Sequence, residues 1–578
     1  MPDSVSLSPA FKTRLDNFLA HDRLGPDPIA ADYDGRRKAW SLFAANVSDA
    51  EAEALRPYLF SYGKLARKAG EPAPKIHNFI DGQWRPPAER HYAAMPSLAD
   101  DRVTIFHVAD SRKPDCDQAI AAADTAWKSL RWADEALGYR KWVVKNFSRL
   151  LHYFREECLR EIREQIPKTY LEAQKDFWEA KRSADHLEGS IEVGLRGELT
   201  PMMLPGQVYW RDPSLPAGPA TLITPMNFIY GIPGIQIVGA YLSGCPFIFK
   251  GHPFAAVTND TLAKLLLASG ADPAFFQKVE GFGPGIATLA TDPRIAVVSV
   301  TGSVDTARKI QEGRGLRRLR FEGGGCNWAY VDDGYTDAEF QRIAVRLTYA
   351  KLGFGSHKCT SLHGIAASRA TLGKLLPMLA EEFDRWKAVD PRDAAPGDDK
   401  IVSPLMVHKA KTALDLMAAA RAAGCQVIRD GGRPEGDYRD HSQAIRPILI
   451  AGVTPETTVR LDWDGRGERD VHLASDEFFM PILVTMEVAS FDAFLNFSLF
   501  VNPHDLATSI WTRDDTKLQR ARRTLAGMIK ENDGTDSALD WEEFGASTLG
   551  ESGNMGVGEV QATLAIFTRR QKGRHLIF

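Results

Sequence analysis

The chain has 578 residues, of which 44% are hydrophobic and 25% charged, and its formal net charge at pH 7 is −4. This composition is typical of a water-soluble globular protein and excludes the collagen-like, disordered and integral membrane classes. At roughly 100–200 residues per domain the length predicts two to four domains, and a charge so near zero gives no general attraction to nucleic acid or to an anionic membrane.

The cysteines and the beginning of the sequence indicate the compartment. The six cysteines are too sparse for a disulfide framework and none belongs to a CxxC pair, so neither a cross-linked secreted fold nor a zinc site is expected. The segment MPDSVSLSPAFKTRLDNF lacks the apolar stretch of a signal peptide, and no apolar run approaches the ~20 residues that a membrane-spanning helix needs. We therefore expect a cytoplasmic protein that has no metal centre and no nucleic-acid or membrane partner.

The first part of the chain predicts a helical arm, then a hairpin and two helices. Residues 1–74 carry many charges with scattered Leu and Phe, which favours an amphipathic helical extension packed on the main body. In KIHNFIDGQWRPP, which begins at Lys75, the pair Asp81-Gly82 indicates a β-hairpin. Amphipathic spacing then predicts helices over 117–130 and 139–166.

From Ala220 onward, predicted strands alternate with predicted helices. The strands are ATLITP, CPFIFK, FFQKVEG and RIAVVSVTGS, and the helices cover 231–242, 258–270 and a segment that begins at Ser303. Such alternation gives right-handed βαβ units and a parallel sheet, which binds ligands at the carboxyl ends of its strands. A second α/β stretch runs from about Cys326 to Met528, and the Gly-rich end of the chain closes with the strand-like TLAIFTRRQ.

One cysteine is a candidate nucleophile. Cys359 lies in GFGSHKCTSLHG, where glycines allow close backbone approach and His357 and Lys358 are neighbouring cations. Adjacent cations lower the pKa of a thiol from about 8.5 and increase the reactive thiolate fraction. A buried, inert thiol is the competing interpretation, and it applies with more force to Cys326 in EGGGCNW, which no cation flanks.

The order of several short motifs decides between these interpretations. TPMNF (224–228), IFK (248–250), VTGS (300–303), FEGGG (321–325), Cys359 and DEFFMP (476–481) follow one another along the chain. Taken singly, each has an ordinary explanation as a turn, a solvated charge, a helix cap or a loop. In this order, and at nearly the same spacings, they resemble the aldehyde dehydrogenase superfamily from about Lys75 to the C-terminus. RLRFEGGGCNW and Ala307 are similar to the branch of 1-pyrroline-5-carboxylate (glutamate semialdehyde) dehydrogenases.

The resemblance implies a mechanism and three catalytic residues. Cys359 would add to the aldehyde, and the Asn227 side chain with the Cys359 backbone N–H would form the oxyanion hole. Glu322 would activate the water that hydrolyses the thioester, and the glycines after it would give it room to move. The implied reaction is NAD(P)-dependent oxidation of an aldehyde or semialdehyde, with glutamate-5-semialdehyde as a candidate substrate.

The resemblance also implies the ligand contacts. The cofactor would be NAD, with NADP as an open alternative because Pro253 stands where NAD-selective relatives often carry Glu, and His252 beside it is basic. The residues that would contact the cofactor are Thr224, Pro225, Met226, Lys250, Gly302, Ser303, Glu477 and Phe479, with Ser303 opening a helix whose dipole favours the pyrophosphate.

The expected contacts with the substrate come from residues beside the nucleophile and near the C-terminus. Thr360 and Ser361 would contact the substrate through their hydroxyl groups. In DWEEFGAS, Glu542 and Glu543 would repel an anionic substrate if they point inward, whereas Trp541 and Phe544 would line a pocket for an apolar aldehyde. His357 replaces a Gln that many relatives have.

The implied fold is α/β, with a Rossmann-type parallel-sheet cofactor domain, an α/β catalytic domain and a β-strand oligomerisation arm. We expect a helical extension over 1–74, a dinucleotide-binding domain over 75–325 interrupted by arm strands near 198–218, a catalytic domain over 326–530, and a C-terminal segment with an arm strand over 531–578. Apolar edge strands at 204–213 and 563–571 predict a homodimer or homotetramer. Two alternatives stay open: an acylating enzyme that uses coenzyme A, against which Glu322 argues, and a non-catalytic dinucleotide-binding relative.

Overall fold

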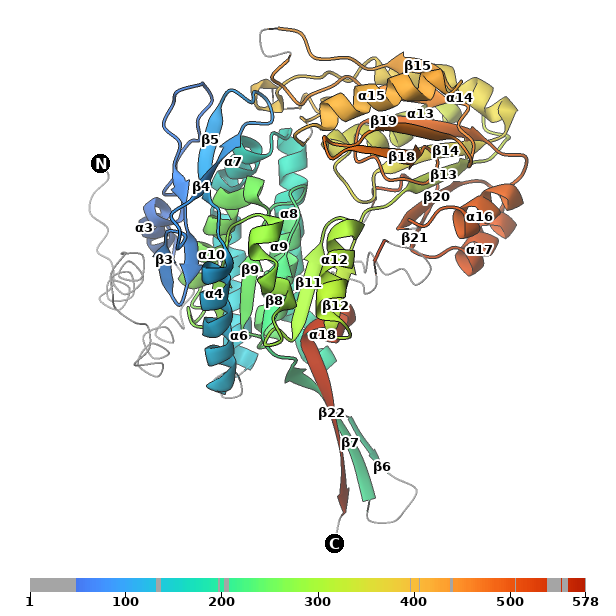
Figure 1. Ribbon diagram of the computed structural model, residues 1–578. Coiled ribbons are helices and arrows are strands. Elements are labelled where there is room, and N and C mark those ends of the chain that lie inside the picture. The colour runs from blue at the N-terminus through green and yellow to red at the C-terminus, as the bar shows by residue number, and fades with distance from the viewer. Residues whose placement is uncertain are drawn as a thin grey trace.

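The computed structural model describes most of the chain. The described residues are 48–130, 132, 137–195, 198–201, 207–395, 397–404, 406–436, 440–504, 506–537, 552–553 and 560–576. Residues 1–47 of the expected N-terminal extension lie outside this set. The part of the extension that is described contains one helix, α3 (Asp49–Leu59), which begins with a capping box between Ser48 and Glu51 and packs its buried face on the first lobe (Figure 1).

The first lobe is built on a seven-stranded sheet. Its strands are β2 (Asn78–Ile80), β3 (Gln83–Arg85), β8 (Ala220–Ile223), β9 (Phe247–Lys250), β10 (Phe276–Lys278), β11 (Val297–Thr301) and β12 (Arg318–Glu322). They lie in the order β12-β11-β8-β9-β10-β2-β3. The strands from β8 to β12 are parallel, and the hairpin β2–β3 adds an antiparallel edge. Because β9 and β11 lie on opposite sides of β8, the strand order reverses there, which places the ligand crevice at the carboxyl ends of β8 and β11.

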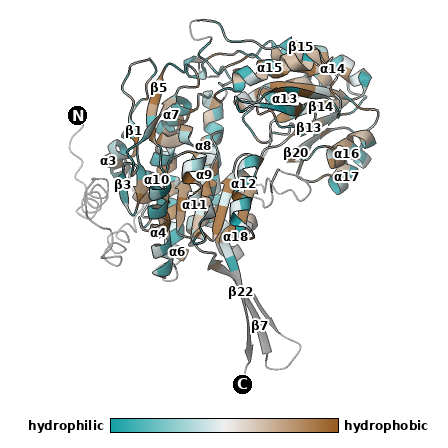
Figure 2. Ribbon diagram, viewed as in Figure 1, coloured by the Kyte–Doolittle hydropathy of each residue, from teal (hydrophilic) through white to brown (hydrophobic). Residues whose placement is uncertain are grey.

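Helices cover both faces of this sheet. They are α4 (Lys113–Lys128), α6 (Leu137–Tyr153), α7 (Arg155–Gln165), α8 (Tyr170–Leu195), α9 (Gly231–Leu242), α10 (Ala256–Ala268), α11 (Thr288–Thr291) and α12 (Val304–Arg314). Every residue of α9 is buried, and Figure 2 colours this helix mostly as hydrophobic. A small sheet of β1 (Lys75–Ile76), β5 (Thr104–Ala109) and β4 (Tyr92–Pro96) lies beside them.

The second lobe contains another seven-stranded sheet. Its strands are β13 (Asn327–Val331), β14 (Leu362–Ala367), β15 (Gln426–Asp430), β16 (Ile448–Ala451), β19 (Ile482–Glu487), β20 (Ala507–Trp511) and β21 (Met528–Glu531), in the order β15-β16-β19-β14-β13-β20-β21. Its helices are α13 (Asp337–Leu352), α14 (Arg369–Phe383), α15 (Lys409–Ala422), α16 (Phe491–Phe500) and α17 (Asp515–Thr524), and a hairpin pairs β17 (Thr458–Asp462) with β18 (Glu468–His472).

A three-stranded arm projects from the first lobe (Figure 1). It consists of β6 (Glu198–Pro201), β7 (Gln207–Pro216) and β22 (Thr568–Leu576), with β7 in the middle and antiparallel to both neighbours. The two predicted edge strands therefore pair with each other within one chain, which leaves β6 and β22 at the edges. The predicted strand over 563–571 is partly wrong, because residues up to Phe567 belong to helix α18 (Val560–Phe567).

The other predicted helices and the predicted hairpin are present in the structure, with differences in their boundaries. The predicted helix over 231–242 is α9, and Asp81 and Gly82 form the hairpin turn with φ of 52° and 69°. The helix predicted over 139–166 is two helices that break at Phe154. The helix predicted over 258–270 begins two residues earlier, at Ala256, after a short 3₁₀ turn, and ends at Ala268. Within the described residues, no helix is both long enough and apolar enough to cross a bilayer.

Candidate active site

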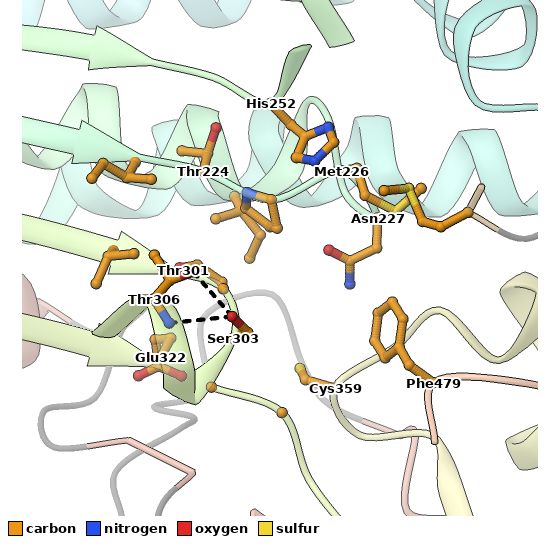
Figure 3. A pocket seen from close by; sticks show the side chains of 18 of the residues that line it. Thr224, Met226, Asn227, His252, Thr301, Ser303, Thr306, Glu322, Cys359 and Phe479 are labelled. Carbon is orange, nitrogen blue, oxygen red and sulfur yellow. Dashed lines mark hydrogen bonds between the residues drawn. The ribbon is translucent and has the colours of Figure 1, made fainter. Parts of the chain in front are cut away.

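A cavity of about 1830 Å³ opens at the carboxyl ends of β8, β9, β11 and β12 and extends to the loop that precedes β14. It is lined by twelve of the predicted site residues: Thr224, Pro225, Met226, Asn227, Lys250, Gly302, Ser303, Glu322, Cys359, Thr360, Glu477 and Phe479. These residues come from both lobes, and Figure 3 shows Asn227, Cys359, Ser303 and Phe479 around one space. Thr224 and Phe479, the first and last of these residues in the sequence, are brought together by the fold.

A strained turn carries Cys359 into this cavity. After α13 ends at Leu352, the residues Phe354, Gly355 and Ser356 have φ of 61°, 59° and 70°. Such values are uncommon for residues with a side chain and cost of order 1–3 kcal/mol each. At Gly355 a Cβ would lie 2.6 Å from the carbonyl oxygen of Ser403, so only glycine fits. The turn sets the direction in which the chain reaches the predicted nucleophile.

The thiol of Cys359 has a raised pKa in this structure. Burial, with the nearby carboxylates of Glu322 and Glu477, raises the pKa of Cys359 to about 12. The expected activation by flanking cations is therefore wrong for the unliganded site. Lys358 Nζ lies 2.8 Å from Asp536 Oδ2 and is paired with that carboxylate, and burial lowers the pKa of His357 to about 3, so its ring is neutral.

Asn227 faces the nucleophile with a fixed side chain. It follows β8, and its Nδ2 donates to the backbone oxygen of His357 at 2.9 Å. A primary amide nitrogen carries two hydrogens, so this bond orients the amide and leaves the second hydrogen for another acceptor. In Figure 3 the amide lies between the turn at Met226 and Cys359. The amide can therefore donate its second hydrogen to an oxygen atom bound in this part of the cavity.

Glu322 ends β12 and is paired with a buried arginine. Its Oε1 lies 3.1 Å from Arg320 Nη2, two residues earlier on the same face of the strand, and both side chains are buried. The backbone around Glu322 is also held, because Gly302 N donates to the Glu322 oxygen at 2.9 Å and Gly323 N donates to the Ser552 oxygen at 2.7 Å. A moving carboxylate must therefore rotate about its own side-chain bonds, and that the following glycines give it room stays a prediction.

The wall formed by β8, β9 and β11 presents polar groups suited to a phosphate and a ribose. Ser303 is the N-cap of α12, and its Oγ accepts from Thr306 N at 3.3 Å (Figure 3). The Thr224 Oγ1 is buried and has no hydrogen-bond partner among the residues that the structure describes. Burial lowers the pKa of Lys250 to about 8, against the attraction of Glu280. An orphaned hydroxyl and a desolvated ammonium are groups that a hydroxyl-rich ligand satisfies.

Glu477 and Phe479 close the cavity from the second lobe. Gly325 N donates to Glu477 Oε1 at 3.3 Å, and a Cβ at Gly324 would lie 1.9 Å from Glu477 Oε2. Burial raises the pKa of Glu477 to about 7, against the attraction of Lys409. Phe479 has φ of 54° and stacks on His357 at 5.1 Å. Gly324 therefore leaves space for a carboxylate that reaches into the cavity.

The predicted substrate contacts differ in their outcome. Thr360 lines the cavity, but Ser361 does not, because its Oγ bonds to Ser356 Oγ at 3.0 Å and to the Lys351 oxygen at 3.1 Å. Phe544, with Trp541, Glu542 and Glu543, lies outside the described residues. Burial lowers the pKa of His252 to about 3, so it offers no positive charge to a 2′-phosphate.

Several charged residues around the site were missed by reasoning from the sequence. They are Arg320 beside Glu322, Asp536 beside Lys358, and three buried side chains at the beginning of α8, Lys168, Glu172 and Asp176. The four-residue spacing of Glu172 and Asp176, which puts both charges on one face of α8, was an available signal. Among the described residues no cluster of His, Cys, Asp and Glu is arranged to hold a metal ion.

Comparison with known proteins gives the same assignment at the level of family and fold. Malonate-semialdehyde dehydrogenase 1 of Geobacillus kaustophilus is 23% identical over 478 residues, covering 81% of this chain and 91% of that protein. The mitochondrial methylmalonate-semialdehyde/malonate-semialdehyde dehydrogenase [acylating] of Mus musculus is 24% identical, covering 79% and 81%. A crystal structure of betaine aldehyde dehydrogenase from Staphylococcus aureus in complex with NAD+ superposes with a TM-score of 0.79 at 19% identity, covering 90% of this chain and 96% of the other.

The family model covers most of the chain. A model of the aldehyde dehydrogenase family matches residues 84–569. The predicted α/β aldehyde dehydrogenase fold is confirmed by the structural likeness, and the predicted class of oxidoreductase is confirmed by the family. The order of motifs along the sequence led to the same result as the comparison of whole chains: this protein belongs to the aldehyde dehydrogenase family.

Proposed function

We propose that this protein oxidises an anionic semialdehyde to the corresponding carboxylic acid with NAD as the hydride acceptor, through a thioester on Cys359. The observation that supports this most is the convergence of Cys359, Asn227 and Glu322 on one cavity at the point where the strand order of a parallel sheet reverses. A nucleophile, an oxyanion donor and a base from three separate segments meet where such sheets bind nucleotides.

The first step is addition of the sulfur to the aldehyde carbon. The Cys359 thiolate forms a C–S bond, and the carbonyl oxygen becomes an anion. The second hydrogen of Asn227 Nδ2 and the backbone N–H of Cys359 donate to this oxygen. Loss of one such donor typically costs about 3–4 kcal/mol of transition-state stabilisation. The bond from Asn227 to His357 favours this geometry because it removes the rotational freedom of the amide.

Loss of a hydride from this adduct to the cofactor would leave a thioester, and hydrolysis of the thioester requires a base. Glu322 takes a proton from a water molecule, the hydroxide attacks the thioester carbon, and the C–S bond breaks to release the acid and regenerate the thiolate. Because Glu322 is paired with Arg320 in this structure, the carboxylate must leave the guanidinium to reach the thioester. The guanidinium of Arg320, 3.1 Å away, balances the charge of this buried carboxylate.

The residues of the cavity fit NAD. Thr224 and Lys250 would contact hydroxyl groups of the adenosine side, Gly302 and Ser303 the pyrophosphate at the N-terminus of α12, and Glu477 the nicotinamide ribose, with Phe479 beside the ring and Pro225 and Met226 against the dinucleotide. When bound, the oxidised cofactor accepts the hydride that leaves the carbon attached to Cys359. NAD is favoured over NADP because His252 is neutral, and NADP is compared directly in the test below.

The wall of the cavity opposite the cofactor contacts favours an anionic substrate. On α8, at the end of α13, and beside Cys359 and β21, the cavity is lined by four basic side chains, Lys175, Arg182, Arg346 and Lys358, and two acidic ones, Glu179 and Asp536. Arg346 and Lys358 share Asp536, at 2.7 and 2.8 Å, and Arg346 also pairs with Asp533 at 2.6 Å, so these side chains with Asp533 carry four positive and three negative charges. A substrate carboxylate would find a net positive wall there, and glutamate-5-semialdehyde and malonate semialdehyde are candidates of this class.

The arm supports an assembly of identical chains. The edge strands β6 and β22 leave backbone groups available for pairing with a second copy. We therefore keep a homodimer or homotetramer, located in the cytoplasm, as part of the proposal.

The test uses the purified full chain and a panel of aldehydes. Reduced cofactor is measured with semialdehydes that carry a carboxylate and with neutral aldehydes of equal length, each with NAD and with NADP. We expect turnover with NAD and a preference for the carboxylates. Cys359→Ala should abolish turnover and leave the Kd of NAD within about twofold, since the sulfur contacts the substrate. Binding of NAD without turnover on any aldehyde would favour a non-catalytic relative instead.

An acylating reaction is the second candidate, favoured by the relative whose name states it. There the sulfur of coenzyme A, in place of water, attacks the thioester. Glu322 is present and opposes this candidate, because an acyl transfer to a thiolate does not need a base for water. Product analysis with and without coenzyme A separates the two: free acid in the absence of coenzyme A supports hydrolysis, and turnover that depends on coenzyme A supports acylation.

A further inference from the structure

Three charged residues lie buried where the chain enters α8. Lys168 comes two residues before the helix, and Glu172 and Asp176, four residues apart in its first turns, share one helical face. Their exposed fractions are 2%, 3% and 0%. Charged side chains are almost never buried to this extent unless they are paired and hydrogen-bonded. We call these three residues the α8 clamp.

The clamp holds the loop that carries Asn227. Lys168 Nζ donates to the backbone oxygen of Asn227 and lies 3.0 Å from Asp176 Oδ2. The Asp176 carboxylate accepts three backbone N–H groups, from Ile229, Tyr230 and Gly231, at 2.9–3.0 Å. The loop between β8 and α9 is therefore fixed on both sides of Phe228, with the Asn227 peptide on Lys168 and the first turn of α9 on Asp176.

The same face holds the loop that carries Cys359. Glu172 Oε1 accepts from the backbone N–H of Phe354, the first residue of the strained turn, and Glu172 Oε2 accepts from Ser403 Oγ at 2.8 Å. The rings of Phe228 and Phe354 stack at 5.1 Å, and Lys168 Nζ lies 5.1 and 5.2 Å from their centroids. One short piece of helix thus contacts the Asn227 loop of the first lobe and the Cys359 turn of the second.

We propose that Lys168, Glu172 and Asp176 are positioning residues for the oxyanion hole, a role that rests on the proposed function. The two donors of the hole, Asn227 Nδ2 and the Cys359 N–H, come from different lobes. The bond from Asn227 to His357, the stacked rings of Phe228 and Phe354, and the clamp tie the two loops at this point. A displacement of about 1 Å in such a site costs roughly 10²-fold in rate. Holding the two donors in place would therefore be the function of the buried charges.

The ion pair by itself does not establish this role. Removing one partner of a buried pair leaves an unpaired charge and destabilises the fold, whereas neutralising both partners together is often neutral for stability. The diagnostic variant is therefore Lys168→Met combined with Asp176→Asn, which keeps an oxygen acceptor for the N–H groups of α9. Arg140→Met is the matched control, because Arg140 is also buried and donates to the oxygen of Leu242 at the other end of α9, at 3.0 Å.

The experiment is a double-mutant cycle on the full chain with Asn227→Ala. Formation of reduced cofactor in a single turnover measures the oxyanion step, and the Kd of NAD and the unfolding midpoint are measured in parallel. We expect Asn227→Ala to slow the step roughly 10²–10³-fold and the paired variant to slow it roughly 10–10²-fold. In the Asn227→Ala background the paired variant should cost less than about threefold, since its effect passes through the missing amide.

Each outcome distinguishes a positioning role of the α8 clamp from a structural one. A loss by the same factor with and without the Asn227 side chain, or a loss equal to that of the Arg140→Met control, would show a merely structural role and overturn the proposal. If the paired variant does not fold, Lys168→Arg enters the same cycle, with the same requirement of a loss that disappears in Asn227→Ala. A normal rate in the paired variant also rejects the positioning role. Absence of aldehyde oxidation in the unsubstituted protein would reject the proposed function first, and is distinguishable because no rate exists to compare.

Discussion

The two walls of the cavity differ in how far their polar side chains are already bonded within the protein. On the wall formed by β8, β9 and β11, Thr224 Oγ1 is buried without a partner among the described residues, and Lys250 is buried with a lowered pKa. On the wall around Cys359, Asn227 and Lys358 are already bonded to His357 and to Asp536, and Ser361, behind the lining residues, is bonded to Ser356. The first wall has polar groups that a ligand can bond, whereas the polar groups of the second wall are bonded within the protein and hold the surroundings of Cys359 in one geometry.

The backbone shows the same contrast. Ser303 begins an unstrained helix with ordinary extended dihedral angles, φ −72° and ψ 150°. The turn before Cys359 has three consecutive residues with positive φ. Strain of this kind persists only where the surroundings hold it in place. A wall that binds and releases a cofactor needs accessible groups, whereas a wall that presents a nucleophile needs a rigid frame.

The largest expected effect concerns the reactivity of the Cys359 thiol in the absence of cofactor. A pKa of about 12 at Cys359, against about 8.5 for a free thiol, lowers the thiolate fraction near pH 8.5 roughly 10³-fold. Only the thiolate reacts, so the rate of iodoacetamide labelling of Cys359, followed by peptide mass spectrometry, should keep rising up to pH 10 and beyond. A cationic ring beside the sulfur favours the anion, so bound NAD+ should move the midpoint to lower pH. A midpoint near pH 8.5 in the unliganded protein would contradict this.

The next effect in size concerns Glu322, which ends a strand of the first-lobe sheet and is the proposed base for hydrolysis of the thioester on Cys359. Glu322→Gln removes the base and leaves the oxyanion hole intact, so hydrolysis of the thioester should slow about 10²-fold while hydride transfer changes little. Stopped-flow measurement should then show a burst of reduced cofactor close to one equivalent per active site. A steady state without a burst would mean that another group is the base or that an earlier step limits the rate.

A smaller effect is expected where the two walls meet, at Gly324. A Cβ there would lie 1.9 Å from the Glu477 carboxylate, so Gly324→Ala must displace Glu477 and weaken its contact with Gly325 N. One lost charge-assisted hydrogen bond of about 1.5 kcal/mol raises the Kd of NAD roughly tenfold, which calorimetry measures. Gly373→Ala is the control, because nothing lies within 4 Å of a Cβ at that position in α14. An unchanged Kd would remove Glu477 from the cofactor site.

The sequence allowed much of this site to be predicted, because the informative residues follow strand ends. Lys250 and Glu322 end buried strands, and Asn227 and Ser303 follow the ends of two others within four residues. Parallel strands bring such positions to one edge. The helix α9 was predicted at its correct bounds because Gly231 and Ser243 punctuate an apolar run. The local sequence pattern predicts the position of a residue where that position depends only on the strand or helix to which the residue belongs.

What the sequence did not reveal depends on contacts between distant segments. Lys358 looks like an activating cation beside Cys359, but its charge is taken by Asp536, 178 residues later. Ser361 looks like a substrate contact, but it bonds to the end of α13. The pKa of Cys359 likewise depends on burial and on carboxylates from two other loops. Electrostatics of this kind require the fold, since neighbours in sequence are not the neighbours in space.

The smallest expected effects have opposite signs on the two walls. Thr224→Val removes a buried hydroxyl without a described partner, so the unliganded protein should gain about 1 kcal/mol of unfolding free energy while the Kd of NAD rises a few-fold. Ser361→Ala removes a hydroxyl that bonds to Ser356 and to the Lys351 oxygen, so it should lose about 1 kcal/mol with the Kd of NAD unchanged. Unfolding in urea with and without NAD measures all four quantities. If both substitutions destabilised the unliganded protein equally, the Thr224 hydroxyl would have a partner already, and the cofactor wall would be as fully bonded as the nucleophile wall.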